Sequence, residues 1–167
     1  MKIKPSSTKK VIKQDYTIPE GFILIIDTRE QDNLFRKPPK GLLIVRDTLQ
    51  SGDYSIKGFE QDVAIERKSL NDFYGSIGKG RSRFKAELER LRKYDWKAIL
   101  IEGTEDQVLS VGSIYTQLTH AQVRQSIVSF EVKYKLAIYY AKSRQDSERW
   151  ILDRLIKWFN YKREGEV

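Results

Sequence analysis

Short apolar runs alternate along the chain with stretches in which apolar residues recur every three or four positions. The runs have the length of β-strands and predict strands over residues 22–27, 42–49, 51–58, 61–68, 96–103 and 134–141. The recurring positions predict helices over residues 69–77, 83–95, 113–130 and 144–162. Strands that alternate with helices indicate the α/β class, and we expect a three-layer α/β/α fold with a central mixed sheet.

The two ends of the chain differ in character. Residues 1–20 are lysine-rich and without periodicity, and are expected to form a flexible basic N-terminal arm. Residues 21–162 contain every predicted element and are expected to fold as one domain. No apolar run approaches the roughly 20 residues that cross a membrane, and the first residues lack the apolar core of a secretory signal. We therefore expect an intracellular protein, in the cytoplasm, nucleoid or nucleus, that is not secreted.

An excess of positive charge indicates the kind of partner. The chain has 31 lysine and arginine residues against 23 aspartate and glutamate residues, a formal net charge of +8. Such an excess favours polyanions, nucleic acid first, and residues 78–97 concentrate it, with eight basic side chains against three acidic ones. The absence of cysteine excludes disulfides, zinc–thiolate sites and thiol catalysis. The single histidine, His120, is expected to be a surface or packing residue.

Candidate chemistry gathers in the predicted strand pair. Glu66 and Lys68 are two residues apart on one strand, so their side chains leave the same face. Asp53 lies on the partner strand, where a hairpin can bring its carboxylate to Glu66. One or two carboxylates suit Mg²⁺ and leave positions for water and phosphate oxygens. A lysine beside them can orient or deprotonate water, or stabilise charge on the phosphate. The pattern points to hydrolysis of a phosphodiester.

Other charged residues surround this strand pair. Asp27, at the end of an apolar strand, and Asp72, at the start of a helix, extend the acidic cluster. Arg29, Arg67 and Arg81 carry the guanidinium group that engages two phosphate oxygens at once. These side chains would give the cluster a means of binding a nucleic-acid backbone.

Each of these residues also has an ordinary structural interpretation. Asp53 follows a glycine and can be a turn residue, and Glu66-Arg67-Lys68 can be the solvated end of a strand. Asp72 stands three residues after Ser69 and can cap its helix. Taken singly, each ordinary interpretation is the stronger one. The functional hypothesis rests on their coincidence in one constellation.

The order of these residues resembles a known family. The segments IDTRE, SGDY, VAIERKSLNDFYGSI, GKGRSRFKAELERLRKYDWKAILIEG and SIYTQL are similar to the XPF-type (ERCC4-domain) structure-specific endonuclease domain. That domain belongs to the restriction-endonuclease-like PD-(D/E)xK superfamily, and its signature is Gly-Asp, a gap, Glu-Arg-Lys, three residues and Asp. The matching residues of the signature are Gly52, Asp53, Glu66, Arg67, Lys68 and Asp72. Further matches are Asp27, Arg29 and Glu30 upstream and Gly80 and Arg81 downstream.

The resemblance implies cleavage of branched DNA, such as flaps, forks or junctions, with Mg²⁺ or Mn²⁺ as cofactor. The catalytic residues would be Asp53, Glu66, Lys68, Asp27, Arg67 and Asp72, with Glu30 and Gly52 in support. The metal ligands would be Asp53, Glu66 and Asp27. The DNA-binding residues would be Arg29, Arg67, Lys79, Arg81 and Arg83.

The resemblance also bears on partners. Nuclease domains of this family tend to dimerise through C-terminal helices, and we expect a homodimer through the C-terminal helical region, or a partner that adds grip on DNA. The apolar face that carries Trp158 and Phe159 suits either such a contact or packing on the domain's own sheet. We expect no helix-hairpin-helix module in this chain, which leaves the preferred DNA structure open. Two other functions stay open as hypotheses. One is a non-catalytic DNA-binding or scaffolding subunit, which the retained acidic pair and lysine disfavour. The other is a four-way-junction resolvase or nicking enzyme with the same catalytic residues.

Overall fold

The computed structural model of the chain describes residues 16–32, 34–110 and 117–167. Within these ranges the strands are β1 (Ile23–Asp27), β2 (Leu43–Asp47), β3 (Tyr54–Ile56), β4 (Val63–Ser69), β5 (Trp96–Glu102) and β6 (Ala137–Ala141). The helices are α1 (Leu70–Ile77), α2 (Arg81–Leu91), α3 (Glu105–Leu109), α4 (His120–Tyr134) and α5 (Arg144–Glu164). All the predicted strands are present, with small differences at their ends.

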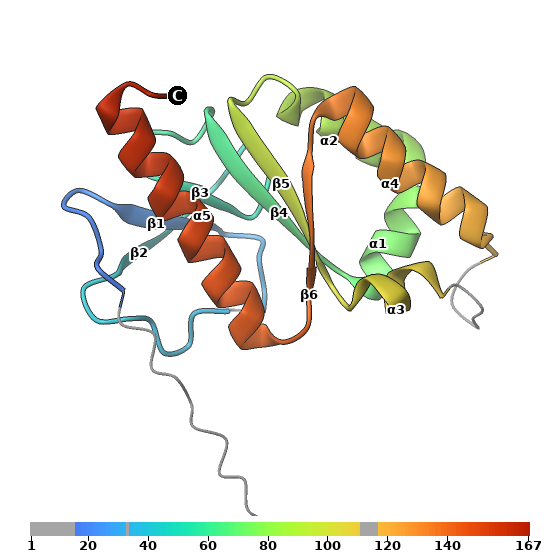
Figure 1. Cartoon of the computed structure of the whole chain (residues 1–167), viewed down its shortest axis with the longest axis horizontal. Coiled ribbons are helices and arrows are strands. Elements are labelled where there is room, and N and C mark those ends of the chain that lie inside the picture. The colour runs from blue at the N-terminus through green and yellow to red at the C-terminus, as the bar shows by residue number, and fades with distance from the viewer. Residues whose placement is uncertain (1–15, 33, 111–116) are drawn as a thin grey trace, which may run out of the picture.

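The strands form one mixed sheet in the order β2-β1-β3-β4-β5-β6. β1 and β2 are parallel, and so are β4, β5 and β6, whereas β3 runs antiparallel to both of its neighbours, β1 and β4. Figure 1 shows α5 across one face of this sheet and α1, α2 and α4 on the other face. The predicted three-layer α/β/α fold with a central mixed sheet is confirmed.

Each face of the sheet has its own hydrophobic core. Leu24 and Ile65 of the sheet pack with Leu155 of α5 in one core, and Ile99 packs with Phe84 of α2 in the other. Successive residues of a strand point to opposite faces, so β4 supplies side chains to both layers. This alternation decides which of its charged residues meet α2 and which meet α5.

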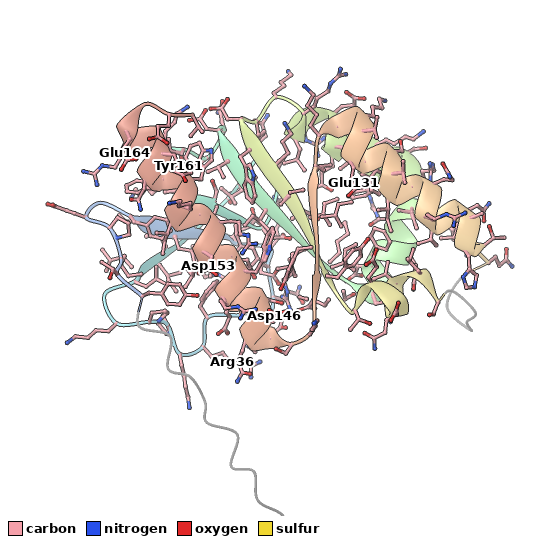
Figure 2. All side chains as sticks on the ribbon, in the orientation of Figure 1. Arg36, Glu131, Asp146, Asp153, Tyr161 and Glu164 are labelled. Atoms are coloured by element: carbon pink, nitrogen blue, oxygen red, sulfur yellow. The ribbon has the colours of Figure 1, made fainter. Side chains whose placement is uncertain are left out.

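The apolar face of α5 is occupied by the domain's own core. Trp158 and Phe159 are buried, and both rings meet Phe59 edge-to-face at centroid distances of 5.3 and 5.9 Å. The outward side of α5 is polar and includes Asp153 (Figure 2). A dimer through Trp158 and Phe159 would therefore require the core to open, so the surface that the sequence suggested for dimerisation is not available in the folded monomer.

α4 begins later than its periodicity predicts. Residues 117–119 are not helical, and Thr119 starts the helix through a capping box: its side chain accepts from the backbone N of Gln122, whose side chain accepts from the backbone N of Thr119. His120 is the first residue of the helix and is exposed. The rest of the predicted start, residues 113–116, lies outside the described residues.

Periodicity misses α3 altogether, because five residues are too few to show a repeat. Its start is marked instead by a second capping box, between Thr104 and Gln107. In the part of the chain that the structure describes, no helix combines the length and the apolar character needed to cross a membrane.

Gly52 lets the chain before β3 pass close to β4. Its φ is +80°, and a Cβ atom there would lie 3.0 Å from Cβ of Ala64 and 3.2 Å from the carbonyl O of Ile65. We expect Gly52→Ala to lower the free energy of unfolding by about 3 kcal/mol, through backbone strain and overpacking together. Gly58→Ala is the matched control, since Gly58 has a φ of +88° with no atom near its Cβ position; strain alone predicts a loss of about 1 kcal/mol. Urea denaturation measures both losses, and equal values would contradict the role of the close approach.

Candidate active site

Glu66 and Lys68 of β4 form an ion pair on the face of the sheet that α2 covers. Nζ of Lys68 donates to Oε1 of Glu66 at 2.8 Å and lies 4.7 Å from the ring centroid of Phe84 in α2. Glu66 is 7% exposed. The shared face that the sequence predicts is therefore present, and it is shielded from solvent by α2.

The strand pairing brings Asp53 alongside the same part of β4. The backbone N of Asp53 donates to the carbonyl O of Ile65 at 2.9 Å, and Oδ2 of Asp53 accepts from the backbone N of Arg67 at 2.7 Å. These two hydrogen bonds lie on either side of Glu66 in the sequence. The structure thus brings Asp53, Glu66 and Lys68 together.

Burial raises the pKa of both carboxyl groups. Burial raises the pKa of Asp53 to about 7, and the negative charge of Glu30 adds to this, while the hydrogen bond from the backbone of Arg67 opposes it. Burial, and then the charge of Asp53, hold the pKa of Glu66 well above its usual range. Two carboxylates that are costly to ionise side by side form a place where a cation is stabilising.

The state of Lys68 narrows its chemical role. Burial alone would lower the pKa of the Lys68 ammonium, but the charge and the hydrogen bond of Glu66 raise it above its ordinary value. Lys68 therefore keeps its proton and can donate hydrogen bonds or neutralise charge. The 2.8 Å ion pair with Glu66 suits Lys68 to orientation and charge stabilisation, and removal of a proton from water by Lys68 stays a prediction.

Asp27 is buried, and both of its carboxylate oxygens are used in hydrogen bonds. Oδ1 accepts from the backbone N and from Nε of Arg29, both at 2.8 Å, and Oδ2 accepts from Nη2 of Arg29 at 3.0 Å and from the backbone N of Leu49 at 2.7 Å. These bonds hold Arg29 at the surface with its side chain 67% exposed. A metal ion would have to displace one of these donors, so the geometry favours Asp27 as the anchor of Arg29. Metal binding by Asp27 stays a prediction.

Arg67 points to the opposite face of β4 from the Glu66–Lys68 pair. Its guanidinium lies 2.6 Å from Glu102, 2.8 Å from Asp32 and 3.3 Å from Glu30, and its side chain is 7% exposed. These ion pairs explain the position of Glu30, which the sequence placed in support of the site. They also occupy the group that was expected to bind DNA, so the geometry favours a structural role for the Arg67 side chain.

Asp72 takes part in the cap of α1, in which Ser69 is the N-cap residue, in agreement with its ordinary structural interpretation. Its backbone N donates to Oγ of Ser69 at 3.1 Å, and the hydroxyl of Ser69 donates to Oδ2 of Asp72 at 2.6 Å. Asp72 is exposed. A catalytic role for Asp72 stays a prediction.

The start of α2 presents the predicted DNA-binding residues. Lys79, Arg81 and Arg83 are exposed, and Nη1 of Arg81 is fixed by the carbonyl O of Ile77 at 3.2 Å and by Oγ of Ser126 at 3.0 Å. Within the part of the chain that the structure describes, no side chain caps the first turn of α2. Backbone N–H groups at a helix start attract anions, so this end of the helix is suited to phosphate groups.

A match to a family model identifies the family of the domain that contains this site. The model of the ERCC4 domain matches residues 26–153, which span every predicted site residue from Asp27 to Arg83. The chain belongs to the ERCC4-domain family. Its resemblance to the XPF-type endonucleases is thereby confirmed.

Individual relatives of this ERCC4 domain agree with the family. The chain is 25% identical over 122 residues to the 3′-flap repair endonuclease Xpf of Saccharolobus solfataricus, which covers 72% of this chain and 48% of that protein. It is similar in fold to XPF from Aeropyrum pernix, with a TM-score of 0.61 and 18% identity, over 79% of this chain and 59% of that one.

A second solved structure extends the likeness in fold. XPF from Aeropyrum pernix in complex with DNA matches with a TM-score of 0.60 and 19% identity, over 84% of this chain and 66% of that one. The ERCC4 domain described here therefore spans about half the length of its curated relative and under two thirds of these solved chains.

The donor set of the site suits a hard divalent cation through two carboxylates. Among the described residues, no group of three or more histidine, aspartate or glutamate side chains is arranged to hold a metal ion. Within the same residues, Oδ1 of Asp53 and Oε2 of Glu66 accept no hydrogen bond. Mg²⁺ commonly takes one or two carboxylates and completes its coordination with water and phosphate oxygens, so these two oxygens are enough to fit it.

We expect Asp53→Asn to stabilise the metal-free protein in a pH-dependent way. The pKa of Asp53 is about 7 in the folded chain against 3.8 ordinarily, so the folded state binds the extra proton and the wild type loses stability as the pH rises from about 4 to about 7. Asparagine does not titrate, so the gain of the variant should grow over this range and level off near about 4 kcal/mol. Thermal unfolding in EDTA from pH 5 to pH 8 measures the gain. A gain that is the same at every pH would contradict the buried, proton-binding Asp53.

Proposed function

We propose that this ERCC4 domain is a divalent-metal-dependent endonuclease that hydrolyses phosphodiester bonds in branched DNA. The observation that carries the proposal is the convergence of Asp53, Glu66 and Lys68 beside α2, which puts two buried carboxyl groups and the amine of a lysine in one place. The name of the Saccharolobus solfataricus relative, a 3′-flap repair endonuclease, supports the same chemistry.

Asp53 and Glu66 would hold the cation, Mg²⁺ or Mn²⁺. When bound, the ion would supply Lewis-acid activation of a phosphate oxygen and of water. Asp53 and Glu66 would offer the oxygens that accept no hydrogen bond within the described residues, Oδ1 and Oε2. Binding requires both carboxylates to be ionised, so protons compete with the cation as the pH falls below about 7.

Lys68 would orient the attacking water and offset the charge that develops on the phosphate, because its ammonium is fixed by Glu66 and keeps its proton. Arg29, held by Asp27 at the surface, would bind a phosphate oxygen next to the scissile bond. Lys79, Arg81 and Arg83 stand further out at the start of α2 and would follow the DNA backbone.

The other two functions make different use of the same residues. A scaffolding subunit has no need of Asp53, Glu66 and Lys68, so their presence in a connected arrangement weighs against it. A junction resolvase would need them all. The chain spans about half the length of its curated relative. We therefore propose, as further parts of the same function, a preference for branched DNA and an intracellular location. We also propose a homodimer or an additional DNA-binding partner.

The experiment is a panel of end-labelled DNA substrates built from shared strands: duplex, single strand, 3′ flap, fork and four-way junction. With Mg²⁺ we expect cleavage of flaps and forks at least about tenfold faster than of duplex, and with EDTA we expect none. Symmetric paired nicks on the four-way junction alone would favour the resolvase. Tight DNA binding without cleavage of any substrate in Mg²⁺ or Mn²⁺ would contradict the proposal in favour of the scaffold.

A further inference from the structure

α2 brings a third acidic side chain, Glu87, to the proposed catalytic centre. Phe84, three residues earlier, lies against Nζ of Lys68 at 4.7 Å from its ring centroid. Arg90, three residues later, donates from Nε to Oγ of Ser51 at 3.2 Å, two residues before Asp53. Residues three apart on a helix lie on neighbouring parts of one face, so Glu87 stands between these two contacts and faces the carboxylate pair.

The surroundings of Glu87 differ from those of its neighbour Glu89 on the same helix. Glu87 is half-buried, and within the described residues it takes part in no hydrogen bond or ion pair. Glu89 lies on the outer side, 3.0 Å from Lys133 and 3.7 Å from Arg92. A glutamate that is half-buried beside other carboxylates, without a hydrogen bond or ion pair among the described residues, has no evident role in stability.

The charge of Glu87 acts on the catalytic residues. Its charge is among those that raise the pKa values of Asp53 and Glu66, which burial also raises, and the pKa of Lys68, which burial lowers. When ionised, the three carboxylates and Lys68 carry −3 and +1, a sum of −2. A divalent cation would offset this negative charge.

We propose that Glu87 is a positioning residue for the divalent cation, which it attracts by its charge and steadies by accepting hydrogen bonds from water in the ion's shell, without joining Asp53 and Glu66 as a ligand. No group of three acidic side chains among the described residues is arranged for direct coordination, and Mg²⁺ usually retains several waters in proteins. The inference rests on the proposed function and names the residue that tunes its metal affinity.

The test is Mn²⁺ binding to the full chain without DNA at pH 8, followed by the electron paramagnetic resonance of free Mn²⁺. Glu87→Gln keeps the shape and removes the charge, and we expect it to weaken Mn²⁺ affinity about fivefold to tenfold. Glu87→Asp keeps the charge and should stay within about threefold of the wild type. Glu89→Gln, the matched control on the outer side of α2, should leave the affinity unchanged.

The result that would overturn the inference is an equal Mn²⁺ affinity for Glu87→Gln and the wild type, or equal losses for Glu87→Gln and Glu87→Asp. Thermal unfolding in EDTA separates a structural role: removal of a like charge should leave the melting temperature unchanged or higher, and a lower value would also overturn it. Mn²⁺ binding by Asp53→Asn distinguishes a failure of the proposed metal-dependent function from a failure of the role proposed for Glu87. If the wild type binds Mn²⁺ no better than Asp53→Asn, the proposed function itself fails. If only Glu87→Gln is without effect, this inference alone fails.

Discussion

Replacing Glu66 by glutamine is expected to lower the rate of Mg²⁺-dependent DNA cleavage by about a thousandfold or more. The substitution removes one of the two carboxylates proposed to hold the cation, and it also removes the negative partner of Lys68 at 2.8 Å. Both losses act on the same step, so the effect should appear in the rate of a single turnover with saturating enzyme. Quenched-flow cleavage of a labelled fork in Mg²⁺ measures it.

Glu60→Gln is the control for this substitution, because Glu60 lies in the turn before β4 and, among the described residues, bonds only the backbone N of Gly58 at 3.0 Å. Its cleavage rate should stay within about twofold of the wild type. Binding of the fork in EDTA should be unchanged or tighter for Glu66→Gln, since a negative charge is removed. Cleavage by Glu66→Gln at the wild-type rate would show that the hydrolysis occurs elsewhere.

Replacing Arg67 by methionine is expected to lower the free energy of unfolding by about 3 kcal/mol. The guanidinium is nearly buried and pairs with Glu102, Asp32 and Glu30. Methionine keeps the length of the side chain but leaves Glu30 and Glu102 partly buried without their positive partner. Chemical denaturation at pH 7 measures the loss, and cleavage should fall only as far as the folded fraction falls.

Arg36→Met is the matched control, because Arg36 pairs with the same Asp32 at 3.5 Å but its side chain is 70% exposed. An exposed pair of this kind contributes little, and we expect a loss of less than about 0.5 kcal/mol. An Arg67→Met variant that is as stable as the wild type but binds DNA more weakly would contradict the structural role. It would support the prediction from the sequence that Arg67 binds DNA.

The part of the site that lies on adjacent strands could be predicted from the sequence. Strand residues alternate between faces, so Glu66 and Lys68 had to share one face, and the short connection between β3 and β4 had to bring Asp53 near them. The same rule puts Arg67 on the other face, away from the catalytic pair. Strand alternation does not predict the ion pairs that Arg67 forms on that face, because Asp32 and Glu102 come from other parts of the chain.

The contributions of α2 and α5 could not be predicted in the same way. Glu87 has the spacing from Phe84 that would place it over the site, but only the packing of α2 on β4 shows which face of that helix meets Lys68. Trp158 and Phe159 make an apolar face that suits either a partner or the domain's own sheet, and only the contacts with Phe59 distinguish the two. The pattern of the sequence predicts on which face of a strand or helix a side chain lies, whereas tertiary packing decides which residue that side chain contacts.

The most direct test of the metal-dependent mechanism is an anomalous difference map from crystals of this chain soaked in Mn²⁺. The account predicts a peak within coordination distance of Oδ1 of Asp53 and Oε2 of Glu66, and no such peak in crystals of the variant that combines Asp53→Asn with Glu66→Gln. A map without a peak at these oxygens, at a Mn²⁺ concentration at which the same protein cleaves DNA, would contradict it.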